Sequence, residues 1–258
     1  MRTLVIFIKE LVESLIRRFK LLFSRAKNNN INAMLKEAGF VKIDGFYTKE
    51  ECKKLRDKID HYIESENTNL WVDDSGADHR VYFINEIDDE FNKFYEDPQI
   101  REGLLNYTGC SEPSGMLLAA RIDAKKGNLG SGGGWHRDSP IRHQFKAVCY
   151  LSDVDTNHGP FQYIKGSHRK LDVFIAYLLG VFKTGQYRFT EKEIEKYLKK
   201  RSKEITEFTA KEGAVAFSDT KGIHRGKPIS EGCRYVLFCY FWSGSIPLHF
   251  EKLRQNKK

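Results

Sequence analysis

The sequence has no closely spaced pair of cysteines. Its five cysteines, at positions 52, 110, 149, 233 and 239, are odd in number and scattered along the chain. Zinc knuckles place two cysteines within a few residues, and disulfide frameworks use an even set, so the pattern argues against both. A chain of this length buries enough core to fold without disulfides. We therefore expect reduced thiols and a cytoplasmic protein.

Long uninterrupted apolar runs are also missing. The first run ends after Ile8 at a Lys-Glu pair, which is too short for a signal peptide, and further charges up to Arg18 prevent a transmembrane helix. At helical period, residues 1–27 instead predict a basic amphipathic helix, with an apolar stripe from Leu4 to Phe23 and seven Lys or Arg against two Glu. Two interpretations fit this helix. It makes peripheral contact with an anionic membrane, or it docks on its own domain or a second subunit.

The net charge of +8 gives no sign of a nucleic-acid partner. Nucleic-acid surfaces usually intersperse aromatic residues among the basic ones, whereas the basic residues of the N-terminal segment accompany aliphatic ones. We therefore expect no nucleic acid to bind. The oligomeric state is left open by the sequence.

The chain divides into regions that differ in composition and in the spacing of their apolar residues. Residues 28–113 are predicted to be a helical part that packs on the core: an Asn-rich linker or turn opens it, and Thr48 with Glu51 forms a capping box. Residues 114–245 carry short apolar runs separated by Gly and Pro, which predicts an antiparallel β core. Residues 169–203 interrupt that core with two helices, as a lid or binding element often does. Residues 246–258 form a basic tail. The fold class is thus mainly β with flanking helices.

Three residues of the β region form a candidate metal site. His136 and Asp138 are two residues apart, so on an extended segment both side chains project to one side. His224 follows a strand, 86 residues after Asp138, and can approach from the other side of a barrel. Two imidazoles and one carboxylate make the facial triad of non-haem iron(II) oxygenases, whereas zinc sites more often have a third His or sulfur ligands. None of the three is specific alone, because isolated histidines are more often structural.

Two cationic residues accompany this triad. Arg234 opens a strand that is otherwise apolar on both faces, and a buried guanidinium needs a partner, for which a carboxylate is well suited. The distal carboxylate of 2-oxoglutarate is one such partner; the alternative is an Arg that faces water at the strand end. Lys146 lies on the strand after the His-x-Asp segment. It either assists the cosubstrate carboxylate or lies at the surface.

The joint pattern resembles the phytanoyl-CoA dioxygenase family of iron(II)/2-oxoglutarate hydroxylases over about residues 114–243. Between the metal ligands, NHGPFQYIKGSH at 157–168 is similar to that family's NGP…PGSH segment, with Lys165 where proline is usual. KEGA at 211–214 is similar to the family's GD approach to the distal His, with Ala214 in place of the acid. The family usually has Gln inside His-x-Asp, and this chain has Arg137, which leaves the role of that middle side chain open.

The resemblance implies a double-stranded β-helix core of the jelly-roll, cupin-like type. It implies iron(II) held by His136, Asp138 and His224, with Arg234 as the anchor for 2-oxoglutarate and O2 as the second cosubstrate. The implied reaction hydroxylates an unactivated C–H bond and releases succinate and CO2. Halogenating relatives replace the carboxylate ligand by Gly or Ala, so the presence of Asp138 favours hydroxylation.

The substrate is expected to be a small molecule. The N-terminal helix and the apolar run Leu171–Phe182 suit an amphiphile, such as a lipid, an acyl thioester or a lipid-linked sugar, unless that run merely packs on the barrel. Basic residues beside the run suit a phosphate group: Arg169, Lys170, Lys183 and Arg188. Two other function classes remain. One is a cupin-type metalloenzyme without 2-oxoglutarate, and the other is a non-catalytic jelly-roll module that binds carbohydrate or lipid.

Overall fold

The computed structural model describes residues 2–24, 29–65, 69–242 and 244–254. The helices are α1 (Arg2–Phe23), α2 (Asn30–Ala38), α3 (Lys49–Glu64), α4 (Asp89–Tyr95), α5 (Pro98–Thr108), α6 (Lys170–Leu178), α7 (Glu191–Arg201) and α8 (Leu248–Glu251), with a 3-10 turn η1 (Ile84–Glu86). The strands are β1 (Phe40–Ile43), β2 (Leu70–Val72), β3 (Asp78–Tyr82), β4 (Ser114–Asp123), β5 (Phe145–Tyr150), β6 (Phe161–Ile164), β7 (Ile205–Phe208), β8 (Val215–Asp219), β9 (His224–Gly226) and β10 (Cys233–Trp242).

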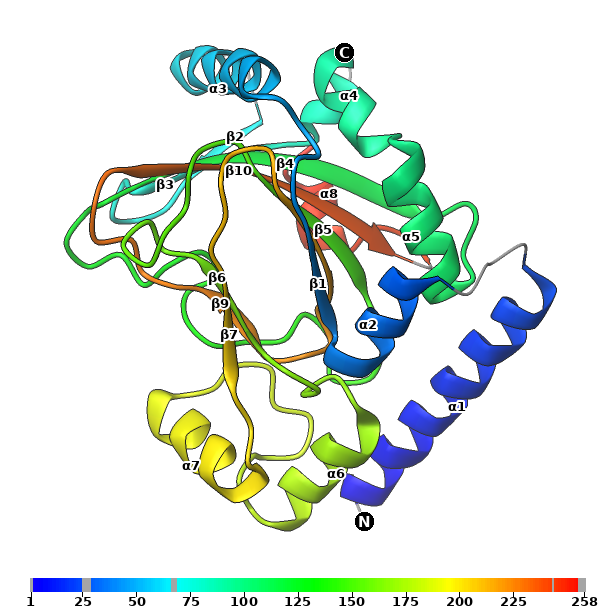
Figure 1. The fold of residues 1–258 in the computed structure, drawn as a ribbon. Helices are drawn as coiled ribbons and strands as arrows, with labels where there is room; N and C mark the ends of the chain where they lie inside the picture. Colours follow the sequence, from blue (N-terminus) through cyan, green and yellow to red (C-terminus); the bar gives the residue numbers. More distant parts are fainter. Residues whose placement is uncertain (1, 25–28, 66–68, 243, 255–258) are drawn as a thin grey trace.

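Two antiparallel sheets face each other in the centre of the molecule (Figure 1). The larger has seven strands in the order β1-β8-β5-β10-β4-β3-β2, and the smaller has three in the order β7-β6-β9. In the larger sheet β10 pairs with β4 on one side and with β5 on the other, although these strands are far apart in the sequence. Two facing antiparallel sheets in which strands distant in the sequence are neighbours form a jelly roll, as predicted.

The central strands of the larger sheet are buried on both faces. On β4, Leu117 and Ala119 pack against the helices that cover the outer face, while Met116, Leu118 and Ala120 face the smaller sheet. Burial on both faces explains why such strands read as continuous apolar runs instead of alternating ones. All five cysteines are free, as predicted, and three of them lie in the buried core.

Residues 28–113 are not the purely helical part that was predicted. Strands β1, β2 and β3 lie here and extend the larger sheet at both edges. The prediction failed because these strands are short, at three to five residues, and lie between helices. Gly39, with a φ of 82°, ends α2 and turns the chain directly into β1. The predicted capping box of Thr48 and Glu51 does form at the start of α3.

The Asn-rich stretch, predicted to be a short linker or turn, is largely the start of a helix. Helix α2 begins at Asn30, and the side chain of Asn29 caps it by accepting a hydrogen bond from the backbone N–H of Asn32. Residue 28 lies outside the described residues. In the predicted tail, α8 packs on the sheet, with the Phe250 ring 5.4 Å from the Trp242 ring, and residues 255–258 lie outside the described part.

The insertion at 169–203 forms a small unit of its own below the smaller sheet (Figure 1). Its two helices enclose a cluster of buried apolar residues that includes Val173, Phe182 and Tyr197, together with Trp135 from the segment before the metal site. One side of the apolar run therefore packs within this unit, whereas its leucines at 171, 178 and 179 are exposed. Its role as a lid stays a prediction.

Helix α1 crosses the outside of the molecule beside α6 and α5 (Figure 1). At its N-terminal end the Phe7 ring lies 4.4 Å from the Phe174 ring of α6. Farther along, the Arg17 guanidinium lies 5.0 Å from the Tyr107 ring of α5. Among the described residues, no helix is long and apolar enough to cross a bilayer.

Candidate metal centre

The backbones of His136 and His224 are fixed to each other. The N–H of each residue donates a hydrogen bond of 2.9 Å to the carbonyl of the other, which forms an isolated antiparallel bridge. Asp138 is held by its own N–H, which donates to the Thr220 carbonyl at 2.8 Å. His224 is the first residue of β9, and His136 lies in this bridge outside the named strands.

The three side chains converge on one point. Oδ1 of Asp138 lies 3.7 Å from Nε2 of His136 and 3.9 Å from Nε2 of His224. All three ligand atoms lie within 4.8 Å of one another. Because His136 and Asp138 come from one segment and His224 from β9, two elements clamp a single site. One metal ion between them is within reach of all three atoms.

Backbone carbonyls set the tautomer of both imidazoles. Nδ1 of His136 lies 2.9 Å from the Gly134 carbonyl, and Nδ1 of His224 lies 2.9 Å from the Gly222 carbonyl. A carbonyl only accepts, so each Nδ1 carries the proton and each Nε2 presents a lone pair to the centre. Nε2 of His224 is buried and has no hydrogen-bond partner among the described residues. A buried hydrogen-bond acceptor without a partner costs about 1–3 kcal/mol. The Nε2 lone pairs are therefore suited to bind a divalent metal ion.

The charges of the triad also suit a metal ligand set. Burial lowers the pKa of His224 to about 3 and lowers that of His136, so both rings are neutral at pH 7. Burial alone would raise the pKa of Asp138, but Lys146 and the two histidines hold it well below its usual range. The carboxylate is therefore ionised. Neutral imidazole and ionised carboxylate are the forms that bind a metal.

Lys146 lies inside the molecule, so the predicted alternative of a surface position is wrong. Its side chain is about 5% exposed, and its Nζ lies 2.7 Å from Oδ2 of Asp138. The same ammonium lies 4.1 Å from the centre of the Tyr240 ring, a favourable cation–π distance. Lys146 thus occupies one oxygen of Asp138 and leaves Oδ1 directed at the histidines. Contact between Lys146 and the cosubstrate stays a prediction.

The Lys146 pair gives a testable prediction. In Lys146→Met, Oδ2 of Asp138 loses its partner and the carboxylate its orientation, and we expect about tenfold weaker metal binding, at the low end of supporting-residue effects. Lys146→Gln keeps a hydrogen-bond donor without the charge, and we expect it to retain most of the affinity. Titration calorimetry with Mn(II) measures both. Binding by Lys146→Met as tight as by the wild type would show that Lys146 does not orient the ligand.

Arg234 points into the space between the two sheets. It shares the inward face of β10 with Val236 and Phe238, as alternation along a strand requires. Its guanidinium is hydrogen bonded to the Tyr150 hydroxyl, but Nε and Nη1 have no hydrogen-bond partner among the described residues. Burial lowers the pKa of Arg234 without neutralising it. A buried cation with two free donors is a site for an anion.

A neighbouring ion pair explains why Arg234 lacks a carboxylate from the protein. Asp78 of β3 attracts Arg234, yet both of its oxygens are bonded to Arg80, at 2.9 and 2.5 Å. Arg80 also donates to Oγ of Ser131 at 3.0 Å. Arg80 was not predicted because β3 was not predicted. Residues 78–82 carry no alternating signal, since three polar residues precede Val81 and Tyr82.

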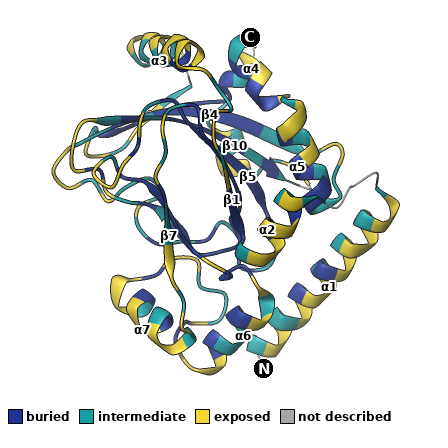
Figure 2. Cartoon of the chain, in the orientation of Figure 1, coloured by how far each residue is buried: buried dark blue, intermediate teal, exposed yellow. Residues whose placement is uncertain are grey.

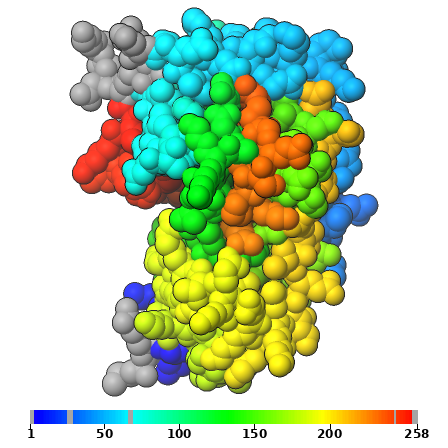
Figure 3. Space-filling model, turned by 90° about the vertical axis from the view of Figure 1, so that its left-hand side faces the viewer, coloured from blue at the N-terminus to red at the C-terminus, as the bar shows by residue number. Residues whose placement is uncertain are grey.

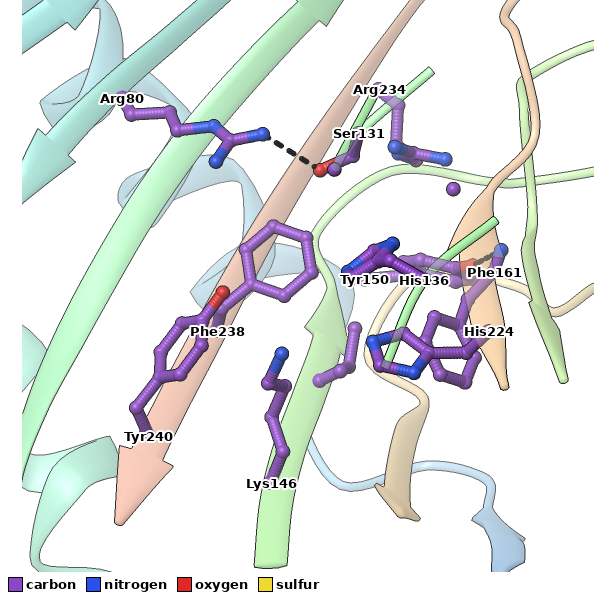
Figure 4. Close-up of a pocket in the computed structure, with 13 residues that line it drawn as sticks. Arg80, Ser131, His136, Lys146, Tyr150, Phe161, His224, Arg234, Phe238 and Tyr240 are labelled. Carbon is purple, nitrogen blue, oxygen red and sulfur yellow. Dashed lines mark hydrogen bonds between the residues drawn. The ribbon is translucent and has the colours of Figure 1, made fainter. Parts of the chain in front are cut away.

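One cavity of about 450 Å³ contains both the metal-binding histidines and Arg234 (Figure 4). Its walls come from both sheets and are largely apolar and aromatic: Val148, Tyr150, Phe161, Phe238 and Tyr240. Arg234 and the histidines therefore face a shared space.

The glycine-rich segment before His136 is fitted to the metal site and is not a phosphate loop. Gly132 has a φ of 88°, and a Cβ added there would lie 2.2 Å from Cε1 of His136. Only glycine allows the backbone to pass this close to the imidazole. The segment therefore covers one side of the ligand ring.

A buried carboxylate that the sequence reasoning also missed supports the turn before His224. Asp219 accepts hydrogen bonds from the Tyr107 hydroxyl at 2.6 Å and from the backbone N–H of Gln144 and Lys221 at 3.0 Å each. It also contacts the His143 ring, which showed no partner in the sequence. These bonds join α5, β5 and β8 at the point from which the chain runs to the metal ligand.

Comparison with known proteins agrees with this geometry. The family model described as phytanoyl-CoA dioxygenase matches residues 35–236. The structure is similar to the epimerase SnoN in complex with Fe3+, alpha-ketoglutarate and nogalamycin RO, with 15% identity over 88% of this chain and 90% of that chain and a TM-score of 0.65. It is similar to EctD from S. alaskensis with bound Fe, with 14% identity over 84% and 80% and a TM-score of 0.64.

A third similar structure is the carbocyclase SnoK from nogalamycin biosynthesis, with 16% identity over 83% of this chain and 84% of that chain and a TM-score of 0.63. At these identities the likeness shows the shared fold. No curated protein matches the chain in sequence.

Proposed function

The chain belongs to the phytanoyl-CoA dioxygenase family of iron(II)- and 2-oxoglutarate-dependent oxygenases, and we propose that it hydroxylates an unactivated C–H bond of a small molecule. One observation carries the proposal. The neutral imidazoles of His136 and His224, which form a triad with the ionised Asp138, line one cavity together with the unpaired donors of Arg234. A metal site alone fits many cupin enzymes, whereas a second, cationic site in the same cavity calls for a ligand with a carboxylate at its far end.

The roles of the residues follow from their positions. Nε2 of His136 and His224 and Oδ1 of Asp138 would hold the iron, and Arg234 would bind the distal carboxylate of 2-oxoglutarate. Iron(II) with 2-oxoglutarate and O2 supplies the oxidising chemistry, with succinate and CO2 as by-products. The protein contributes fixed ligands, a bound cosubstrate and a largely apolar cavity that excludes water.

The carboxylate ligand supports hydroxylation as the outcome. Asp138 occupies the position that a halide needs in halogenating relatives, and Lys146 holds its second oxygen in place. Two of the similar structures are an epimerase and a carbocyclase, so this fold supports several outcomes after the oxidising step. Identification of the product therefore decides between these reaction outcomes.

The substrate proposed is an amphiphilic or phosphate-bearing small molecule that enters through an outer cleft. This cleft, of about 1030 Å³, shares Arg80 and Gly132 with the inner cavity. Figure 3 views the face on which the segments near residues 75 and 130 border it. Trp71 and Leu129 provide apolar surface and Arg188 an exposed guanidinium. Of the four basic residues predicted to suit phosphate, Arg188 is the one that lines this cleft.

Product analysis under ¹⁸O2 tests this function. The enzyme is incubated with Fe(II), 2-oxoglutarate and a cellular extract of polar lipids and acyl thioesters, beside a His136→Ala control. We expect a compound other than succinate to gain one ¹⁸O atom, and only with the wild-type enzyme and 2-oxoglutarate, because succinate takes up the other atom of O2 in every turnover. A compound that instead loses two hydrogens, or changes stereochemistry at constant mass, would replace hydroxylation by cyclisation or epimerisation.

A further inference from the structure

Helix α1 attaches to the protein mainly through its polar residues. Glu10 is 2% exposed and lies 3.1 Å from the ammonium of Lys221, itself buried. Glu13 pairs with Arg142 at 3.0 Å, and the Thr3 hydroxyl hydrogen bonds that of Thr184 at 2.6 Å. Ile6 and Phe7 add apolar contact at the N-terminal end. The docked face is therefore the charged one.

The apolar stripe of α1 faces outward. Figure 2 shows the outer side of α1 as exposed along most of its length. Phe19 is 62% exposed and Leu22 is 80% exposed. The usual surface helix of a soluble protein has the opposite arrangement, with its apolar stripe on the core. The exposed large apolar residues of α1 are Leu4, Val5, Ile8, Leu11, Val12, Leu15, Ile16, Phe19, Leu22 and Phe23.

The charges beside this stripe are all positive. Lys9, Arg18 and Lys20 are exposed, and at 3.6 residues per turn Lys9 and Lys20 lie along one edge of the stripe and Arg18 along the other. Glu10 is buried against Lys221, and Glu13, about 31% exposed, is paired with Arg142. The outward surface thus combines an apolar centre with cationic edges and carries no unpaired acidic side chain from α1.

We propose that α1 docks on an anionic lipid bilayer, lying in the interface with its apolar stripe inserted among the acyl chains. Lys9, Arg18 and Lys20 then meet the anionic headgroups, while Glu10 and Glu13 keep the helix attached to the protein. A second copy of α1 is a poorer occupant, since it would bring the same three cations into the contact and no acid to pair with them. The proposal is independent of the reaction proposed above.

Docking in this orientation leaves the outer cleft open to water. In Figure 1, α1 lies at one side of the molecule and strands β2 and β3, which border the cleft, lie at the opposite side. The membrane contact therefore positions the enzyme without covering its entrance.

Vesicle sedimentation with the full chain tests the proposal. We expect the wild type to sediment with phosphatidylcholine vesicles that contain phosphatidylglycerol, and much less with phosphatidylcholine alone. Leu15→Glu should lower the partition coefficient about tenfold or more, because it puts a charge into the inserted stripe. Leu248→Glu changes a leucine outside α1 that is even more exposed (71% against 55% for Leu15) and should leave binding unchanged. An unchanged thermal melting curve would verify that both variants fold.

The charge contribution is tested separately by Lys9→Gln combined with Lys20→Gln, which should reduce the preference for anionic vesicles and leave the fold intact. Three results would overturn the proposal: a wild type that stays in the supernatant, equal binding by Leu15→Glu, or a wild-type dimer in light scattering that Leu15→Glu dissociates. The last would identify a second copy as the occupant. Loss of turnover alone would bear on the proposed function and leave this inference untouched.

Discussion

Substitution of His224 by alanine is expected to weaken metal binding more than about 100-fold, since loss of residues that merely support a ligand already costs 10–100-fold. The reason is geometric: His224 supplies one of three ligand atoms, and its Nε2 is otherwise unpartnered in a buried site. Calorimetry with Mn(II) measures the affinity, and conversion of 2-oxoglutarate to succinate should fall to background with it.

The matched control for this prediction is His61→Ala. His61 is an exposed histidine on α3, a helix that contributes no residue to the triad. It should bind metal and turn over 2-oxoglutarate like the wild type. If His224→Ala still bound one metal ion with near wild-type affinity, the triad would not be the metal centre.

The second large effect is expected at Arg234. Replacement by methionine removes the cation that would pair with the distal carboxylate of 2-oxoglutarate. Truncating one partner of a buried charge pair costs about 2–5 kcal/mol, which corresponds to roughly 30-fold to several thousand-fold weaker binding. Metal affinity should be unchanged, because Arg234 is not a ligand. Calorimetry with 2-oxoglutarate on the Mn(II)-loaded protein separates the two effects.

Arg234→Met carries a second readout in the absence of 2-oxoglutarate. The wild-type guanidinium is buried with Nε and Nη1 unpartnered, so its removal should raise the melting temperature of the free protein. Arg80→Met is the contrasting control: Arg80 is bonded to both oxygens of Asp78, and its loss should lower the melting temperature. If Arg234→Met bound 2-oxoglutarate with an affinity within twofold of the wild type, Arg234 would not be the residue that binds its distal carboxylate.

The β core was predictable because its strands are buried on both faces, which makes runs such as β5 and β10 apolar at nearly every position. Arg234 was recognisable for the same reason, because it is a charged residue in an otherwise apolar strand. Strands β1, β2 and β3 were not predicted, since three to five residues are too few for a period to emerge between helices.

Other features depend on the tertiary structure and leave no trace in a single sequence. The amphipathic period of α1 identifies its stripe, but the direction of that stripe depends on where Lys221 and Arg142 lie in space. In the same way, Lys146 reads as an ordinary strand residue until β5 brings it beside Asp138. Both cases need a partner that is distant in sequence.

The hydrogen bonds that orient the two histidine rings end on main-chain carbonyls, each belonging to the residue two positions earlier. Any amino acid has such a carbonyl, but here both belong to glycines in constrained positions. Gly134 has a φ of 90°, and a Cβ added at Gly222 would lie 1.9 Å from the Tyr163 hydroxyl. The aim of the two proposed iron ligands therefore depends on a backbone path that a residue with a side chain would disturb, so a change at either glycine would reach the metal site without altering a ligand.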